Sequence, residues 1–421
     1  MSTTINPAMG SLATGANTAA HALPAAPSHG LRGRVARRVL ARILRKVPIT
    51  ARLASGETYG ERGRPVIEIT EPDAFFARLG HSPMIGLGES YMAGEWQAGP
   101  NTDLADALAP FAERLTELIK PSFYRLRHVV LPRMLSAEEN TRDGARRNIE
   151  RHYDLSNDMF KQFLDPSMSY SSALFDVVDP VPTVDQFEAA QLSKVDSILD
   201  AAAVGPDSRV LEIGTGWGTL AIRAAQRGAR VTTITISTEQ AALAQERVDA
   251  AGMSDRVEIA LRDYRDQTGV FDAVVSVEMI EAVGEKFWPT YFDTIDSLLA
   301  PGGKLAIQAI LLEHHRLEAT RNTYTWIHKY IFPGGLLPST QAIESVLAAH
   351  TSLRITGIMP MGGHYAHTLR LWRENFLANW PSVASLGFDA TFRRMWEFYL
   401  AYCEAGFRTG YLDVAQIRIE R

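Results

Sequence analysis

The chain has 421 residues, of which 46% are hydrophobic and 22% charged, enough for roughly two to three domains with buried cores. Its single cysteine, Cys403, excludes an internal disulfide and a closed cysteine zinc site, so no metal centre is expected and the chain suits a reducing cytosol. No stretch approaches the roughly 18 apolar residues of a membrane span, and the N-terminus lacks the pattern of a secretory signal. We therefore expect a cytoplasmic protein, either soluble or peripheral on a membrane.

The charge is unevenly distributed along the chain. Residues 1–56 carry eight Lys or Arg and no acidic residue, which leaves 35 basic and 48 acidic residues in the remainder. Residues 1–30 are rich in Ala, Gly, Ser, Thr and Pro, a composition that predicts a disordered tail. In LRGRVARRVLARILRKV, residues 31–47, apolar residues recur at helical spacing among arginines until Pro48. This pattern predicts a basic amphipathic helix.

Two roles are open for this helix. If it lies on an anionic membrane surface, each basic side chain contributes on the order of 1 kcal/mol to binding. Alternatively, it packs on its own domain and keeps its arginines in solvent. A nucleic-acid partner is not expected, because the acidic remainder of the chain would repel it.

The sequence divides into three parts. We assign residues 1–56 to the tail and the basic helix, and residues 57–145 to a small α+β accessory domain. Residues 146–421 form the third part, in which apolar β-runs alternate with amphipathic helices. This alternation predicts an α/β fold with helices on both faces of the sheet.

A glycine-rich loop follows the first strand of the third part. In VLEIGTGWG the apolar run 210–213 leads into Gly214, Gly216 and Gly218. Glycines allow positive φ and let a ligand approach bare backbone at a helix N-terminus. The order E-x-G-x-G-x-G differs from the dinucleotide fingerprint, and no acidic ribose partner follows the second strand. Glu212 suits an ammonium group or a structural hydrogen bond, so the loop favours S-adenosylmethionine over a dinucleotide.

Further cofactor contacts are expected near the ends of neighbouring strands, because ligands of open α/β sheets bind at the carboxyl ends of the strands. The candidates are Tyr170, Ser171, Thr235, Ile236, Gln240, Tyr264 and Arg265. Each of them is also compatible with an ordinary position in a surface loop.

Taken together, the motifs resemble the cyclopropane fatty acid synthase family, from about Val66 to the C-terminus. They are HYDLSNDMF, YSSALFD, LEIGTGWG, TISTEQ, DYRD, VEMIEAVG, YIFPGGLLPS, HYAHTLRLW and CEAGFR, preceded by EPDAFFARLG and IGLGESYMAGEWQ. The resemblance implies a class I S-adenosylmethionine-dependent methyltransferase sheet (Rossmann-like), a membrane-facing or lipid-facing accessory domain and a helical lipid-binding insertion. It also implies methyl transfer to a cis double bond of an acyl chain in membrane phospholipid.

The resemblance further implies which residues form the site. Glu281 in MIEAVG matches the family's active-site glutamate, Tyr365 in HYAHTL its tyrosine, and Cys403 in YCEAGF its cysteine. The family uses these residues with a bound bicarbonate that takes a proton. Here Ser172 stands in place of a cysteine and Gln308 in place of a histidine. These departures alter the bicarbonate pocket, because glutamine, unlike histidine, cannot gain a proton.

Simpler structural roles are open for two of these residues. Glu281 is placed where it could cap the helix that follows it. Cys403 on an apolar helix is compatible with a small buried hydrophobic residue rather than a nucleophile.

The departures also bear on the product. The motifs resemble the methylene-forming, tuberculostearate-pathway branch more than the ring-forming branch. We therefore expect a 10-methylene chain made from an oleoyl-type substrate on the inner face of the cell membrane, followed by a downstream reductase, with a cyclopropane ring as the alternative product. A homodimer is compatible with the sequence. Remote alternatives are a nicotinamide-dependent oxidoreductase and a membrane-binding protein without catalysis.

Two further groups of residues are candidates for substrate and cofactor contacts. Aromatic side chains expected to line an acyl channel are Trp326, Tyr330, Phe332 and Trp372. A helix that covers the cofactor is expected to begin near His152 and Tyr153, with Asp154 and Ser156 as caps.

Overall fold

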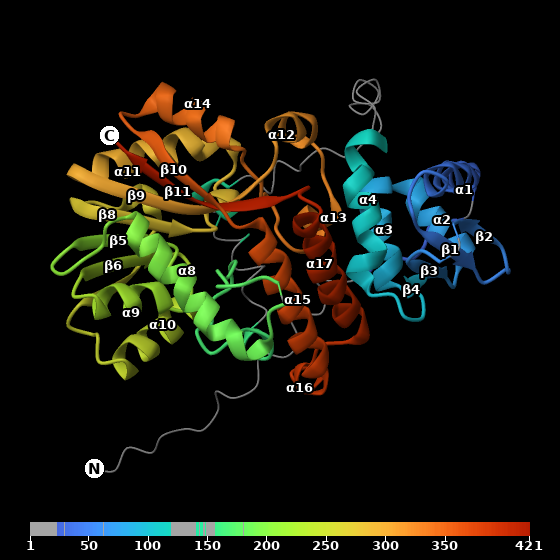
Figure 1. Cartoon of the computed structure of the whole chain (residues 1–421), viewed down its shortest axis with the longest axis horizontal. Coiled ribbons are helices and arrows are strands. Elements are labelled where there is room, and N and C mark those ends of the chain that lie inside the picture. The colour runs from blue at the N-terminus through green and yellow to red at the C-terminus, as the bar shows by residue number, and fades with distance from the viewer. Residues whose placement is uncertain are drawn as a thin grey trace, which may run out of the picture.

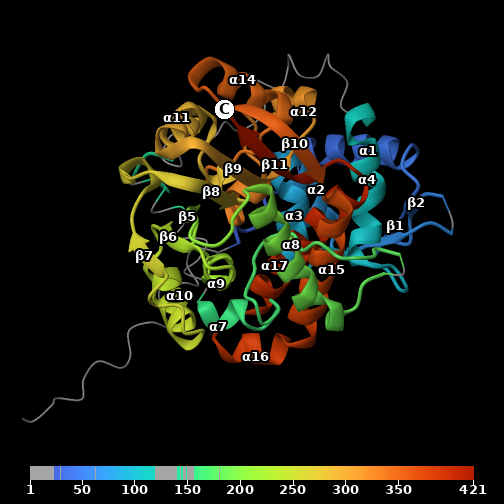
Figure 2. The same ribbon diagram turned by 60° about the vertical axis from the view of Figure 1, so that its left-hand side comes forward.

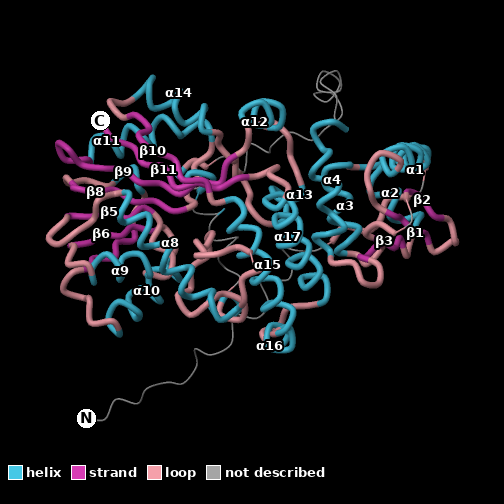
Figure 3. The backbone as a smooth tube through the Cα atoms, viewed as in Figure 1, coloured by secondary structure: helices cyan, strands magenta, loops and turns pink. Residues whose placement is uncertain are grey.

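The computed structural model describes residues 23–28, 30–61, 63–118, 140–142, 144–145, 148, 156–179 and 181–421. Two sheets lie at opposite ends of the molecule with helices between them (Figure 1), and the two groups of strands are separate in Figure 3. The predictions for residues 1–22 and for His152, Tyr153 and Asp154 lie outside the described residues. No helix in the described part of the chain has the length and apolar character that a membrane span requires.

The N-terminal unit is built on a four-stranded sheet of order β2-β1-β3-β4. Its elements are α1 (Leu31–Leu44), β1 (Thr50–Leu53), β2 (Thr58–Gly60), β3 (Val66–Ile69), α2 (Pro72–His81), α3 (Pro83–Met92), β4 (Trp96–Ala98) and α4 (Leu104–Leu118). Strand β1 pairs antiparallel with β2 and parallel with β3. The domain boundary expected at residue 56 is therefore wrong, because it falls inside the β1–β2 hairpin and separates α1 from its own unit.

The predicted basic helix is present as α1 and docks on α2. Gly80 of α2 allows the close approach, because a Cβ at this position would lie 2.6 Å from the backbone of Arg32. At the end of α1, Leu44 is fully buried. One of the two roles left open for the helix, packing on its own domain, is therefore observed.

The larger sheet has seven strands in the order β10-β11-β9-β8-β5-β6-β7. They are β5 (Arg209–Ile213), β6 (Arg230–Thr235), β7 (Val257–Leu261), β8 (Phe271–Val277), β9 (Leu299–Leu311), β10 (Arg354–Pro360) and β11 (Asp413–Glu420). Neighbouring strands from β7 to β9 are parallel, whereas β11 inserts antiparallel between β9 and β10. The α/β sheet expected from the sequence is confirmed.

Helices cover both faces of this sheet (Figure 1). One face carries α8 (Phe187–Ala201), α9 (Thr219–Gln226) and α10 (Thr238–Ala250), and the other carries α11 (Trp288–Leu298) and α14 (Thr340–His350). Small side chains such as Ala221 and Ala224 of α9 pack on Val210 and Val231. Both faces of the parallel strands are thus buried, which explains why these strands read as continuous apolar runs.

A helical layer joins the two sheets. Its main members, α15 (Gly362–Ala378) and α17 (Ala390–Arg408), pack against each other, as Figure 2 shows from a second direction. The shorter helices are α7 (Asn157–Phe160), α12 (His314–Thr320), α13 (Trp326–Tyr330) and α16 (Trp380–Ser385). Arg373 of α15 is buried and contacts Asp103 and Glu404, each at 2.8 Å. This ion-pair network fixes the start of α4 against α15 and α17.

Candidate active site

The glycine loop lies where the sequence places it, between β5 and α9. Gly214, Gly216 and Gly218 all have positive φ, at 100°, 51° and 87°. No heavy atom lies within 4 Å of the position that a Cβ on Gly216 would occupy. Gly218 forms the N-cap of α9. Bare backbone therefore faces open space at a helix N-terminus, which is the geometry that a bound ligand requires.

Glu212 sits in β5 directly before this loop. It is 4% exposed, and its Oε2 has no hydrogen-bond partner. Burial raises the pKa of Glu212 to about 8. A buried carboxyl oxygen without a partner is costly, and a bound ammonium group would satisfy it. The residues present therefore fit S-adenosylmethionine, which the glycine backbone and Glu212 would hold.

The candidates that follow β6 and β7 lie at the same edge of the sheet. Thr235 donates to Oε1 of Gln240 at 3.0 Å, and Ile236 between them is half-buried. After β7, Arg265 pairs with Asp263 at 2.6 Å, and Tyr264 beside it is half-buried. Because β5, β6 and β7 are adjacent and parallel, their carboxyl ends bring these loops together.

Tyr170 and Ser171 precede α8 and make contacts inside the protein. The Tyr170 hydroxyl shares a hydrogen bond with Tyr399 at 2.8 Å. The Ser171 hydroxyl accepts a hydrogen bond from Nζ of Lys194 at 2.6 Å. Lys194 is 3% exposed, and burial lowers its pKa to about 8. Sequence reasoning missed this buried lysine, whose charge acts on Glu212.

Glu281 lies in the turn after β8, and it does not cap the helix that follows. Its Oε1 accepts a hydrogen bond from the backbone N–H of Ile310 in β9 at 2.5 Å. Its Oε2 is buried without a partner. Burial, together with the nearby charge of Glu278, raises the pKa of Glu281 to about 8. Glu281 is therefore mostly protonated at neutral pH.

Glu278 is the centre of the site, and sequence reasoning missed it. Its Oε1 accepts hydrogen bonds from the backbone N–H of Ser172 at 2.9 Å and from Nε2 of Gln308 at 2.8 Å. Its Oε2 accepts one from the hydroxyl of Tyr365 at 2.7 Å. Three residues singled out in the sequence thus converge on a fourth. The available signal was an acidic residue directly after a buried strand.

Ser172 and Gln308 contact Glu278 through different kinds of atoms, a backbone N–H for Ser172 and a side-chain amide for Gln308. Ser172 binds Glu278 through its backbone, while its hydroxyl donates to the carbonyl of Ala173 at 3.0 Å. The amide of Gln308 is oriented by Gln416, which donates to its Oε1 at 3.2 Å. Gln308 therefore presents its N–H group to Glu278. The serine side chain has no part in this cluster.

Cys403 on α17 is half-buried among tyrosines. Burial raises the pKa of its thiol to about 12. The thiol is neutral at physiological pH, and a neutral thiol is a poor nucleophile. Its position is that of a packing residue beside Tyr365 and Tyr399, whose pKa values it influences.

Aromatic rings form a cluster around Tyr365, the tyrosine that donates to Glu278. Tyr365 stacks on Phe407 with centroids 4.4 Å apart, Tyr170 lies 5.1 Å from Trp372, and Phe332 lies 5.8 Å from Tyr399. The faces of such rings attract a positive charge. Of the four aromatic residues expected along an acyl channel, Phe332 and Trp372 belong to this cluster.

The other two, Trp326 and Tyr330, belong instead to the contact between α13 and α3. The Trp326 indole N–H lies 3.4 Å from the sulfur of Met92. The Tyr330 hydroxyl donates to Glu89 at 2.8 Å. Helical aromatic spacing thus also serves the packing of two helices, and a place for Trp326 and Tyr330 along an acyl channel stays a prediction.

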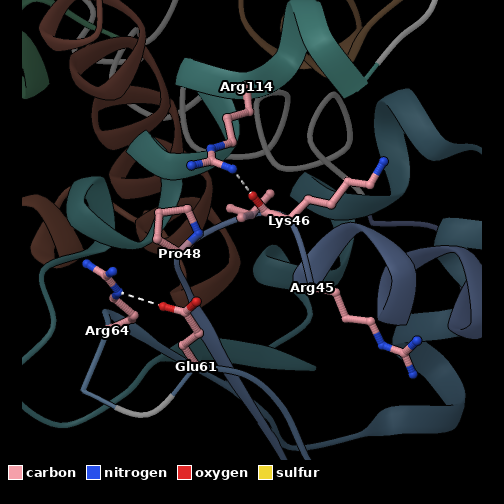
Figure 4. Close-up of a pocket in the computed structure, with 7 residues that line it drawn as sticks. Arg45, Lys46, Pro48, Glu61, Arg64 and Arg114 are labelled. Atoms are coloured by element: carbon pink, nitrogen blue, oxygen red, sulfur yellow. Dashed lines mark hydrogen bonds and ion pairs between the residues drawn. The ribbon is translucent and has the colours of Figure 1, made fainter.

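A separate surface pocket of about 400 Å³ lies in the N-terminal unit, between the segment that follows α1 and Arg114 of α4 (Figure 4). Its lining is mostly basic and consists of Arg45, Lys46, Val47, Pro48, Glu61, Arg64 and Arg114. Arg64 contacts Glu61 at 3.1 Å, and Arg114 donates to the carbonyl of Lys46. The pocket adds to the positive surface next to α1.

Comparison with known proteins gives consistent matches. The family model described as mycolic acid cyclopropane synthetase matches residues 140–417. The chain is 50% identical to the tuberculostearic acid methyltransferase UfaA1 of Mycobacterium tuberculosis over 398 residues, covering 94% of this chain and 92% of that protein. It is 35% identical to the cyclopropane-fatty-acyl-phospholipid synthase of Escherichia coli, covering 84% and 87%.

Solved structures agree with the sequence matches. The mycolic acid cyclopropane synthase CmaA1 complexed with SAH and CTAB has a TM-score of 0.59 at 29% identity, covering 66% of this chain and 98% of that one. The cyclopropane synthase MmaA2 from Mycobacterium tuberculosis has a TM-score of 0.60 at 29% identity, with the same coverage. These findings confirm the predicted resemblance and the class I methyltransferase fold. They give no support to a nicotinamide-dependent oxidoreductase.

Proposed function

The chain belongs to the mycolic acid cyclopropane synthetase family of S-adenosylmethionine-dependent methyltransferases, and from this premise we propose its substrate and product. The substrate is an unsaturated, oleoyl-type acyl chain of a membrane phospholipid. The product is a 10-methylene chain, which a separate reductase would convert to a 10-methyl branched chain. The name of the 50% identical relative supports this choice.

One structural observation carries the proposal: a pair of half-buried carboxyl groups, Glu278 and Glu281, lies beside the glycine loop, and Tyr365 of the aromatic cluster donates to Glu278. A Cβ on Gly214 of the loop would contact Met279, the residue next to Glu278, at 3.6 Å. An alkene is a weak nucleophile, and its methylation gives a carbocation that must then lose a proton. Carboxylates and aromatic faces stabilise the carbocation, and a carboxylate can accept the proton.

The reaction then follows in balanced steps. S-adenosylmethionine supplies a methyl group activated by a sulfonium. The alkene electron pair would form the new bond to this methyl at C10 as the S–CH3 bond breaks, with its electron pair left on the sulfur of S-adenosylhomocysteine, and the positive charge would develop at C9. A hydride shift from C10 to C9 moves the charge to the methyl-bearing carbon. Loss of a proton from the methyl gives the exocyclic methylene, whereas loss before the shift, with ring closure, gives a cyclopropane.

We also propose that α1 docks the enzyme on an anionic membrane. Leu31, Val35 and Val39, spaced four residues apart, are 70%, 48% and 47% exposed. Arg34 and Arg38 between them and Arg42 after them are also exposed. An apolar stripe flanked by arginines matches the surface of an interfacial helix. The basic pocket of Figure 4 continues this surface.

The substrate assignment is tested by release of S-adenosylhomocysteine on vesicles. Anionic dioleoyl vesicles should support turnover, and fluid vesicles of a saturated lipid with the same head group should not, because they offer no alkene. Equal turnover on both lipids would contradict the proposal. Turnover on free oleate but not on vesicles would reject the phospholipid as the substrate.

A further inference from the structure

The Glu278 carboxylate is held by three hydrogen-bond donors. It accepts hydrogen bonds from Ser172, Gln308 and Tyr365, which come from three separate segments. The charge of buried Lys194 also acts on it. The chain reaches this point in a left-handed conformation, with φ of 48° at Glu278. Such a conformation is uncommon for glutamate, and strained residues of this kind cluster at active sites.

This arrangement does not fit the bicarbonate implied by the family resemblance. A bound bicarbonate needs hydrogen-bond donors, and the three donors of this cluster already bind Glu278. A second anion would also lie against the Glu278 carboxylate, with Glu281 close by. Repulsion between like charges in a buried site makes such binding unfavourable. We therefore assign no step to bicarbonate.

We propose that the Glu278 carboxylate is itself the general base that removes the proton from the methylated acyl cation. The inference rests on the proposed function. In the step, the methyl C–H bond breaks and its electron pair forms the exocyclic C=C bond. The proton goes to Oε2 of Glu278, which uses one lone pair for Tyr365 and has another for the proton. The protonated Glu278 returns its proton to water after the product leaves.

The neighbouring Glu281 is less suited to this role. Its pKa is about 8, so at neutral pH it is mostly protonated. Burial also raises the pKa of Glu278, but three donors and Lys194 oppose that rise. The two carboxyl groups thus differ in environment, because four groups favour the charged form of Glu278, whereas the charge of Glu278 itself disfavours that of Glu281. When the environments of two carboxyl groups push their pKa values apart, the difference indicates which of them acts as the base.

Bicarbonate dependence of the wild-type enzyme gives the first test. Turnover on dioleoyl vesicles is measured in carbonate-free buffer under argon and again with millimolar sodium bicarbonate. The proposal predicts rates equal within about twofold, since a general base contributes on the order of 10²–10⁴-fold. A tenfold or larger stimulation would overturn it. No turnover in either buffer would instead refute the proposed function, on which the inference rests.

Glu278 variants give the second test. Glu278→Gln keeps the shape and should lower turnover by about 10²-fold or more, while S-adenosylhomocysteine affinity and thermal stability stay near wild type. Glu278→Ala should regain activity at least several-fold with added formate or bicarbonate, because a small anion can then reach the donors. The half-buried Glu285→Gln, whose carboxylate pairs with Arg321 at 3.4 Å, is the control. Turnover of Glu278→Gln within about threefold of wild type, or loss of cofactor binding with turnover, would overturn the assignment.

Discussion

Replacing Tyr365 by phenylalanine tests how the base is held. The change removes the hydroxyl that donates to Oε2 of Glu278 at 2.7 Å, while the ring keeps its stacking on Phe407. A hydrogen bond to a charged group contributes about 1.5–3 kcal/mol. Since one pKa unit corresponds to about 1.4 kcal/mol, the pKa of Glu278 should rise by about one to two units in this variant.

The sign of the effect on activity follows from the role of the base. Glu278 must be ionised to accept a proton, so activity is lost as the pH falls through its pKa, which burial already places above the ordinary value. In Tyr365→Phe the acidic limb of the kcat/KM profile should move up by about one to two pH units.

The assay is S-adenosylhomocysteine release on dioleoyl vesicles across the pH range, with Tyr402→Phe, an exposed tyrosine of α17, as the matched control. Tyr402→Phe should keep the wild-type profile. An acidic limb of Tyr365→Phe that coincides with that of the wild type would refute the assigned contact between Tyr365 and an ionised Glu278.

Three further predictions concern separate parts of the molecule. The affinity for S-adenosylhomocysteine should increase as the pH rises through about 8, because Glu212 must ionise to pair with an ammonium group; calorimetry on Glu212→Gln should show this pH dependence reduced. Val35→Asp should weaken binding to anionic vesicles by about tenfold, since a charge replaces an apolar contact; the equally exposed Val177→Asp is the control in a sedimentation assay, and equal binding of both would reject docking through α1. Ser172→Cys should keep the same product and a turnover within about threefold of wild type, because Ser172 holds Glu278 through its backbone. A different product in NMR, or a larger loss of turnover, would contradict this prediction.

The sequence predicted those parts of the fold whose pattern lies within a single strand, helix or loop. The apolar runs of β5 to β9 and the glycine loop after β5 are each formed by residues that are adjacent in the sequence. The sequence alone was therefore enough to identify them. The N-terminal boundary at residue 56 was placed wrongly because the change in charge does not coincide with the change in structure. Strand β1 carries part of the basic region but pairs with β2 and β3.

The centre of the site depends on contacts between distant segments. Glu278 lies 106 residues from Ser172 and 30 from Gln308, and no spacing rule relates them. Comparison of motifs pointed to Glu281, since that position matches the family pattern. The sequence identified the departures at Ser172 and Gln308 but not the carboxylate that both of them bind. From the sequence, these departures indicated an altered bicarbonate pocket. In the structure, both residues bind the Glu278 carboxylate.

The most direct test of the account is proton NMR of the fatty acids recovered after the enzyme has acted on dioleoyl phospholipid vesicles with S-adenosylmethionine in carbonate-free buffer. Mass alone does not separate the products, because the methylene chain and the cyclopropane are isomers. The account predicts vinylidene proton signals, formed without bicarbonate. Cyclopropyl signals would contradict the proposed product, and a product that forms only when bicarbonate is added would contradict the role of Glu278.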